Sequence, residues 1–175
     1  MRQLVYSVAA SLDGFIAGPN GEYDWIVRDP SIDFGEIFGR FDTLVMGRHS
    51  YEGILREGHS VKEFGMKAFV ASTTLDPAKH ADVTIVSTDL AKTVADLKTK
   101  SGKDIWLFGG GNLFRSLLDA GLVDRVDIAL IPVLLGGGIP LIPQGRRWSL
   151  RFKDSRTFPS GIVSLTYGVA SEPRI

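Results

Sequence analysis

The chain has 175 residues, of which 44% are hydrophobic and 23% charged, a composition typical of a folded domain that excludes an intrinsically disordered protein. Twenty basic and twenty acidic residues cancel, so no global field recruits nucleic acid or an anionic membrane, and an anionic ligand needs a local site. The absence of cysteine excludes disulfides and cysteine metal sites, and the three histidines show no metal-ligand spacing, so we expect no metal. Without a signal-like segment or 18 consecutive apolar residues, we expect one cytoplasmic domain over residues 1–175.

The first part of the chain alternates apolar strands with helical segments. Residues 4–10 are predicted to form a buried strand, and residues 11–21 a loop. Apolar side chains then recur at i, i+3, i+4 and i+7 after Asp33, which predicts a helix there. Further short strands are expected over residues 43–46, 68–71, 83–86 and 104–108, with helices over 49–55, 89–100 and from 112 to the glycine at 121.

The pattern changes after residue 121. Three strands are expected over residues 125–135, 149–157 and 162–170, with no helix between them and a Pro-Ser-Gly turn before the last. The chain is therefore predicted to have an α/β fold, with a mostly parallel central sheet, helices on both faces and a C-terminal antiparallel hairpin that extends one edge.

The most informative segment is the triple glycine after the strand at 104–108. Gly109, Gly110 and Gly111 let the backbone turn tightly and approach a large ligand, and a helix starting at Asn112 aims its free N–H groups at the same place. This strand–glycine turn–helix unit is typical of a dinucleotide pyrophosphate site, although it is not the G-x-G-x-x-G fingerprint. The alternative is a glycine turn that only packs the strand against the helix.

Ligands of such sheets bind outside the carboxyl ends of the strands. The strand at 43–46 ends at Gly47, which permits close backbone approach, and Arg48 offers a guanidinium to a phosphate. Ser72 and Thr73 follow the neighbouring strand and supply hydroxyl groups to the same phosphate. An arginine beside hydroxyls suits a 2′-phosphate and favours NADP over NAD. The alternative is that Arg48 is a solvated residue at a helix start and Ser72 a cap.

Segments 11–14, 46–48, 72 and 109–111, each after a strand and in this order and spacing, resemble the dihydrofolate reductase superfamily over nearly the whole chain. Segments 10–14, 121–127 and 131–138 are also similar to the reductase domain of the bifunctional riboflavin-biosynthesis deaminase–reductase and its stand-alone bacterial relatives. The resemblance implies a dihydrofolate-reductase-like three-layer fold, NADPH as cofactor and a small-molecule substrate. The cofactor-binding residues that it implies are Ala10, Gly47, Arg48, His49, Ser72, Thr73, Phe108, Gly109, Gly110, Gly111, Asn112 and Leu113.

The substrate side departs from these families. The riboflavin reductase has a substrate-contacting glutamate where this chain has Phe108, which favours a different or more apolar substrate. Dihydrofolate reductase has an acidic residue in its first long helix, to which Asp33 and Glu36 come nearest, and Asp13 is a competing candidate proton donor. Asp33 is alternatively a helix N-cap, and Asp13 alternatively a loop brace. Trp25 and Phe34 are the candidates for a substrate pocket.

The sequence thus predicts an NADPH-dependent reductase that transfers a hydride to a C=N or C=O carbon of a small planar or carbonyl substrate. The alternatives are the riboflavin-pathway reductase of 5-amino-6-(5-phosphoribosylamino)uracil and an NADPH-binding module without turnover. Apolar residues over 126–135 and in the loop 136–143 indicate a partner surface, so we expect a homodimer. Alternatively, that loop folds back over the domain's own core.

Overall fold

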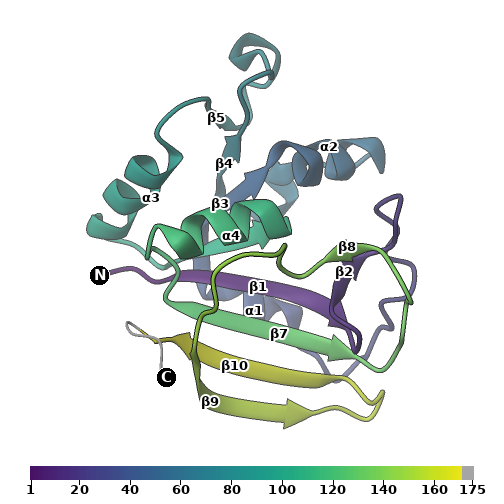
Figure 1. Ribbon diagram of the computed structural model, residues 1–175. Coiled ribbons are helices and arrows are strands. Elements are labelled where there is room, and N and C mark those ends of the chain that lie inside the picture. Colours follow the sequence, from purple (N-terminus) through teal and green to yellow (C-terminus); the bar gives the residue numbers. More distant parts are fainter. Residues whose placement is uncertain (171–175) are drawn as a thin grey trace.

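The computed structural model describes residues 1–170, and its centre is an eight-stranded sheet with the strand order β5-β4-β3-β6-β1-β7-β10-β9 (Figure 1). The strands of this sheet are β1 Leu4–Ser11, β3 Phe41–Gly47, β4 Lys67–Ala71, β5 Thr84–Val86, β6 Asp104–Gly109, β7 Arg125–Ile131, β9 Leu150–Thr157 and β10 Val163–Val169. The helices are α1 Phe34–Gly39, α2 Arg48–Arg56, α3 Leu90–Thr99 and α4 Gly111–Asp119, with the short 3-10 helices η1 Val61–Phe64 and η2 Pro77–Lys79.

The strands from β5 to β7 in this order pair in parallel, whereas β10 pairs antiparallel with both β7 and β9. The parallel strands need crossover connections, which α2, α3 and α4 provide, while a tight turn is enough between β9 and β10. The predicted mostly parallel sheet with a C-terminal hairpin at one edge is confirmed.

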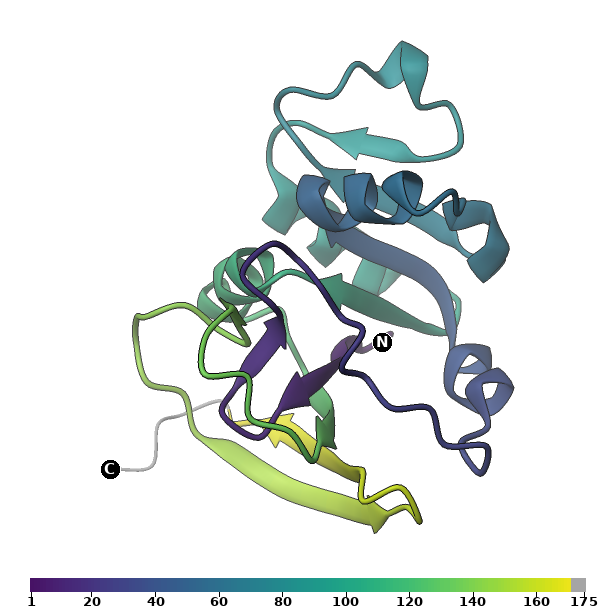
Figure 2. The same ribbon diagram turned by 90° about the vertical axis from the view of Figure 1, so that its right-hand side faces the viewer.

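Successive residues of a strand point to opposite sides of the sheet. Both faces of this sheet carry buried apolar side chains, and helices cover both. On β1, Leu4 and Tyr6 belong to one buried cluster and Val5 to the other. Helices α3 and α4 contribute to the first cluster, and α2, η1 and α1 to the second. Figure 2 shows α4 (green) and α1 (dark blue) on opposite sides of the sheet.

The structure corrects two of the predicted elements. The strand expected over 125–135 ends at Ile131. There the backbone N–H of Val133 donates to the carbonyl of Ile131, and the carbonyl of Val133 accepts from the backbone N–H of Leu12. A second, two-stranded sheet joins β2 (Phe15–Ala17) to β8 (Ile139–Pro140), which the sequence did not predict. These short pairings hold the loops after β1 and β7 together at the carboxyl edge.

The apolar loop 136–143 partly folds back over the chain's own core, as the alternative to a partner surface expected, and the homodimer stays a prediction. Leu141 and Ile142 pack against the chain's own core, and the backbone N–H of Leu141 donates to Gly14. Ile139 and Leu134 stay exposed, at 41% and 69% of their surface.

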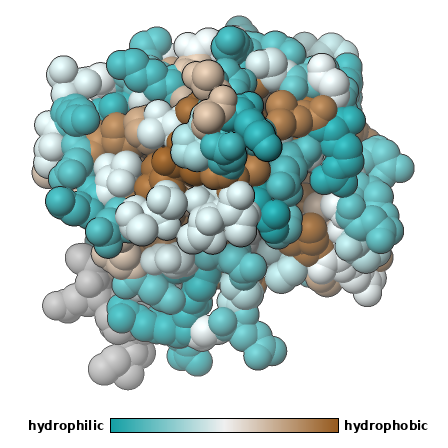
Figure 3. Space-filling view, turned by 90° about the horizontal axis from the view of Figure 1, so that it is seen from above, coloured by the Kyte–Doolittle hydropathy of each residue, from teal (hydrophilic) through white to brown (hydrophobic). Residues whose placement is uncertain are grey.

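Seen from above, the molecule shows mostly hydrophilic side chains, with apolar ones in separate patches between them (Figure 3). Within residues 1–170, no helix combines the length and apolar character needed to cross a membrane.

Candidate cofactor and substrate site

Two helices begin side by side at the carboxyl edge. Strand β3 passes into α2 at Gly47, and β6 passes into α4 at Gly110. The two strand ends are neighbours, because Met46 pairs with Gly109. Neither N-cap glycine has a side chain to bind the first N–H groups of its helix. Both helix starts therefore present backbone donors and the positive end of a helix dipole at this edge.

Each of the three consecutive glycines occupies a different structural environment. Gly109 has a φ of +148°, which only glycine adopts readily. A Cβ on Gly111 would lie 2.7 Å from the carbonyl oxygen of Pro140, so Gly111 is required by the chain's own packing. A Cβ on Gly110 would meet nothing within 4 Å, and the same holds for Gly47. Open space therefore faces Gly110 and Gly47 at the two helix starts, as a pyrophosphate lying there requires.

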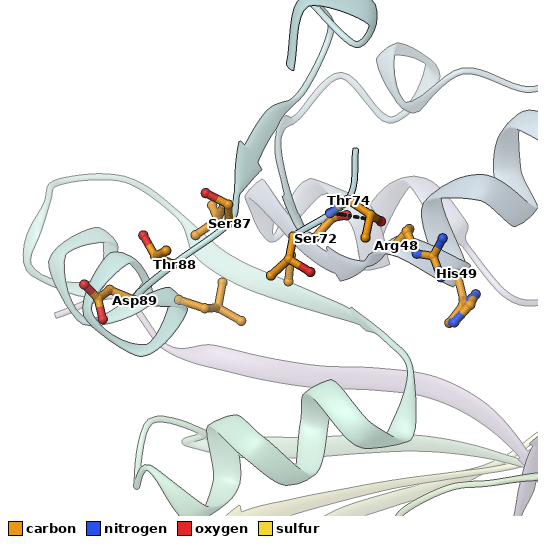
Figure 4. Close-up of a pocket in the computed structure, with 11 residues that line it drawn as sticks. Arg48, His49, Ser72, Thr74, Ser87, Thr88 and Asp89 are labelled. Atoms are coloured by element: carbon orange, nitrogen blue, oxygen red, sulfur yellow. Dashed lines mark hydrogen bonds between the residues drawn. The ribbon is translucent and has the colours of Figure 1, made fainter. Parts of the chain in front are cut away.

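A cavity of about 480 Å³ opens beside α2. The predicted residues Arg48, His49, Ser72 and Thr73 line it together. Its remaining lining residues are Ala71, Thr74, Val86, Ser87, Thr88, Asp89 and Leu90, from the ends of β4 and β5 and the start of α3. Figure 4 shows Arg48 and His49 on one side of Ser72, and Ser87, Thr88 and Asp89 on the other. Hydroxyl groups and one arginine around such a cavity suit the phosphate-bearing end of a nucleotide.

Arg48 keeps a donor group available at this cavity. Its NH1 lies 3.4 Å from Oε1 of Glu52 one helical turn later, and 39% of its side chain is exposed. Exposed pairs of this kind contribute at most about 1 kcal/mol, so a phosphate competes effectively for the guanidinium. His49 is 88% exposed, and its Nδ1 lies 3.8 Å from Oε2 of the same carboxylate.

The Ser72 side chain is partly used by its own turn. Its hydroxyl oxygen accepts from the backbone N–H groups of Thr74 and Leu75, at 3.2 and 3.1 Å, as the capping alternative anticipated. The hydroxyl proton of Ser72 is still available for donation, and the hydroxyl of Thr74 lies 3.4 Å from that of Ser72. Thr73 is exposed beside it.

The other predicted cofactor residues lie outside this cavity. Ala10 is buried with its side chain in the core, so only its backbone can face a ligand. Leu113 packs on the same core from the first turn of α4, whereas Asn112 is exposed there. Phe108 is half-buried at the end of β6 and packs on the opposite face of the sheet.

Strands β1 and β6 part at their carboxyl ends. Their pairing stops at Tyr6 and Leu107, although β1 continues along β7 to Ser11. The indole N–H of Trp106 donates to the carbonyl of Ser7 at 2.9 Å and so satisfies a backbone acceptor that β6 leaves unpaired.

The two candidate proton donors are both bound to backbone. Asp33 accepts from the N–H of Glu36 at 3.0 Å and is the N-cap of α1. Asp13 accepts from Ser11 and from the N–H groups of Leu135 and Gly136, and these hydrogen bonds, led by the Ser11 hydroxyl, lower the pKa of Asp13. These contacts match the capping and bracing alternatives, and the proton-donor roles stay predictions.

The loop that carries the predicted substrate residues is anchored at its end. Asp29 is buried and accepts from Ser31 and from the N–H of Ser160 in the β9–β10 turn; the Ser160 and Ser31 hydrogen bonds lower the pKa of Asp29. Trp25 donates its indole N–H to the carbonyl of Glu22 within the loop. Phe34 is 51% exposed at the start of α1.

Several contributors to the site were absent from the predicted set. Ser87 and Thr88 follow β5 and could have been included by the strand-end rule that selected Ser72. Pro140 and Leu141, which lie against Gly111, are more than 25 residues away from it in sequence and carry no local signal. Across the part of the chain that the structure describes, no three histidine or acidic side chains gather as a metal ion would require.

Known proteins match this chain along nearly its whole length. It is 34% identical to the uncharacterized protein YyaP of Bacillus subtilis, over 95% of this chain and 94% of that protein. A crystal structure of a Shewanella sp. PV-4 protein named for riboflavin biosynthesis superposes with a TM-score of 0.82 at 30% identity, covering 97% of this chain and 99% of that one.

A more distant structure shares the fold. The deaminase/5-amino-6-(5-phosphoribosylamino)uracil reductase of Thermotoga maritima superposes with a TM-score of 0.71 at 14% identity, covering 97% of this chain and 57% of that one. The family model of the RibD C-terminal domain matches residues 2–164. The resemblance expected from segments 10–14, 121–127 and 131–138 is thus confirmed, and the chain belongs to the RibD C-terminal domain family.

Proposed function

We propose that this protein is an NADPH-dependent reductase that transfers a hydride to a C=N or C=O carbon of a small planar or carbonyl substrate. The observation that carries the proposal is the joint placement of the Arg48 cavity and the open side of Gly110 at one edge of the sheet. The Arg48 cavity suits a 2′-phosphate, and the open side of Gly110 leaves room for a pyrophosphate beside a helix start. Membership in the reductase family supports the same cofactor.

The chain's own residues bind and orient in this proposal. Arg48 and the hydroxyls around the cavity hold the adenosine end, and the N–H groups at the starts of α2 and α4 hold the pyrophosphate. NADPH held by these residues would supply a hydride to the substrate carbon. Asp13 is held by hydrogen bonds from Ser11, Leu135 and Gly136, and Asp33 caps α1, so in this proposal water gives the proton to the substrate oxygen or nitrogen.

The first test is cofactor selectivity. We expect wild-type protein to bind NADPH more tightly than NADH, and Arg48→Ala to weaken NADPH binding about tenfold or more, since a hydrogen bond to a charged group contributes about 1.5–3 kcal/mol. NADH binding should change little. Dissociation constants for both cofactors, measured by nicotinamide fluorescence, check this expectation.

Arg56→Ala is the matched control, because Arg56 lies in the last turn of the same helix and is exposed. It should leave both affinities unchanged. Equal affinities of wild-type protein for NADPH and NADH would contradict the assignment of the cavity.

A second candidate is the reductase step of riboflavin biosynthesis on 5-amino-6-(5-phosphoribosylamino)uracil, which the family match favours. Oxidation of NADPH by this compound, followed at 340 nm as the loss of nicotinamide absorbance, distinguishes it from the main proposal. Stoichiometric NADPH binding with no oxidation by this or any carbonyl substrate would instead identify a binding module.

We further propose that the protein is a homodimer that pairs through its C-terminal strands. Every residue of β9 is exposed, and β9 is the last strand of the sheet among residues 1–170. An edge of this length is usually covered or paired. Light scattering at micromolar concentration should give twice the mass of one chain, and the mass of a single chain would refute the dimer.

A further inference from the structure

Helix α2 begins with two side chains that can carry positive charge. Arg48 and His49 are its first two residues, and its first turn has no acidic residue. The start of a helix is the positive end of its dipole, so a cation there is unfavourable, and a cation four residues before an anion is the less favourable order of such a pair. Local helix stability therefore does not explain Arg48 at this position, whereas an anion in the adjoining cavity does.

Glu52 is the only acidic residue of α2, and its carboxylate faces both of these side chains. Its Oε1 lies 3.4 Å from Nη1 of Arg48, and its Oε2 lies 3.8 Å from Nδ1 of His49. Residues three and four positions apart share one side of a helix, which is why one carboxylate reaches both. The two oxygens of a single anion are thus directed at two side chains that line the cavity.

Both contacts of Glu52 are loose. They are longer than the distance of about 2.7–2.9 Å at which a cation donates a hydrogen bond to a carboxylate. The side chains of Arg48 and Glu52 are 39% and 37% exposed, so water screens the attraction between them. A phosphate can therefore replace the carboxylate, but the negative charge of Glu52 stays beside the guanidinium and opposes a second anion there.

We infer that Glu52 competes with the 2′-phosphate of the cofactor for Arg48 and His49, and thereby limits the preference for NADPH over NADH. This inference rests on the proposed function and adds a residue that sets its cofactor specificity. Because Glu52 acts through Arg48 and His49, it is a positioning residue. NADH has no 2′-phosphate, so its binding does not depend on the charge of Glu52.

Glu52→Gln tests the inference, because it keeps the size of the side chain and removes its charge. We expect the variant to bind NADPH about three- to fivefold more tightly than wild-type protein, the range that an exposed ion pair allows, and NADH equally well. In about 1 M salt, where the Debye length is about 3 Å, the gain should fall below about twofold. Fluorescence titrations of both cofactors at low and high salt measure this, and a purely structural effect would change both affinities at either salt concentration.

Glu57→Gln is the matched control, because Glu57 is exposed directly after the last residue of α2 and loses the same charge. It should leave both affinities unchanged. In the Arg48→Ala background, Glu52→Gln should change NADPH affinity less than about twofold, since its main partner is gone. Unchanged or weaker NADPH binding in Glu52→Gln, or the full gain without Arg48, would overturn the inference. Absence of NADPH binding by wild-type protein would instead refute the proposed function.

Discussion

Gly110→Val should abolish cofactor binding and leave a folded domain. A Cβ at this position meets no atom within 4 Å, and the backbone there is extended, with φ −85° and ψ −177°, a conformation that valine adopts. The side chain would therefore project into the space that the pyrophosphate needs. Overlap with a fixed ligand costs about 3 kcal/mol, which corresponds to a loss of roughly a hundredfold in NADPH affinity.

Titration of NADPH, with the melting temperature measured on the same samples, separates a loss of cofactor affinity from a loss of fold stability. Gly111→Ala is the contrasting variant, because its Cβ would lie 2.7 Å from the carbonyl oxygen of Pro140. That overlap destabilises the fold by about 1–3 kcal/mol and lowers the melting temperature. Unchanged NADPH affinity in Gly110→Val would mean that the glycine turn is only structural.

The second large effect is expected at Asp127, which is 8% exposed on β7. Its Oδ2 accepts from Arg40 at 2.8 Å, and its Oδ1 lies 3.1 Å from Nε of Arg125, whose side chain is 17% exposed. Asp127→Ala leaves the buried guanidinium of Arg125 without its counter-charge. Removing one partner of a buried pair destabilises a protein by about 3–5 kcal/mol, which urea unfolding measures as the free energy of unfolding.

Two further variants identify why Asp127→Ala loses stability. Arg40→Ala removes the more exposed partner, at 43%, and should cost no more than about 1 kcal/mol. The double variant Arg125→Met/Asp127→Leu replaces both charges by apolar side chains and should recover most of the stability lost in Asp127→Ala. A loss below about 1 kcal/mol in Asp127→Ala would show that water or other groups solvate Arg125.

The arrangement of strands and helices was largely predictable, because it follows from local periodicity. Alternation on β1 separates Leu4 and Tyr6 from Val5, and this alternation is present in the sequence before folding. The helix after Asp33 was recognisable in the same way, although it is only six residues long. Predictions were poorest where pairing is distant, as for β2 with β8, which joins Phe15 to Pro140 through main-chain contacts that carry no sequence pattern.

The cavity beside α2 could also be anticipated. In a parallel sheet the carboxyl ends of neighbouring strands meet at one edge, so the end of β3 at Gly47 and the end of β4 near Ser72 had to lie together once β3 and β4 were neighbours. The position of the glycine turn was predictable because it also follows the end of a strand. The individual roles of its three glycines were not predictable, because they depend on which atoms lie opposite each Cα.

By itself, therefore, the sequence determined the fold class, the edge of the sheet that carries the site and the residue types that meet there, since all three depend on spacing along the chain. The tertiary structure decided that Gly110 faces open space, that Gly111 faces Pro140, and that Asp13 braces Leu135 and Gly136. These outcomes depend on segments tens to more than a hundred residues apart, whose contacts exist only after the sheet has formed.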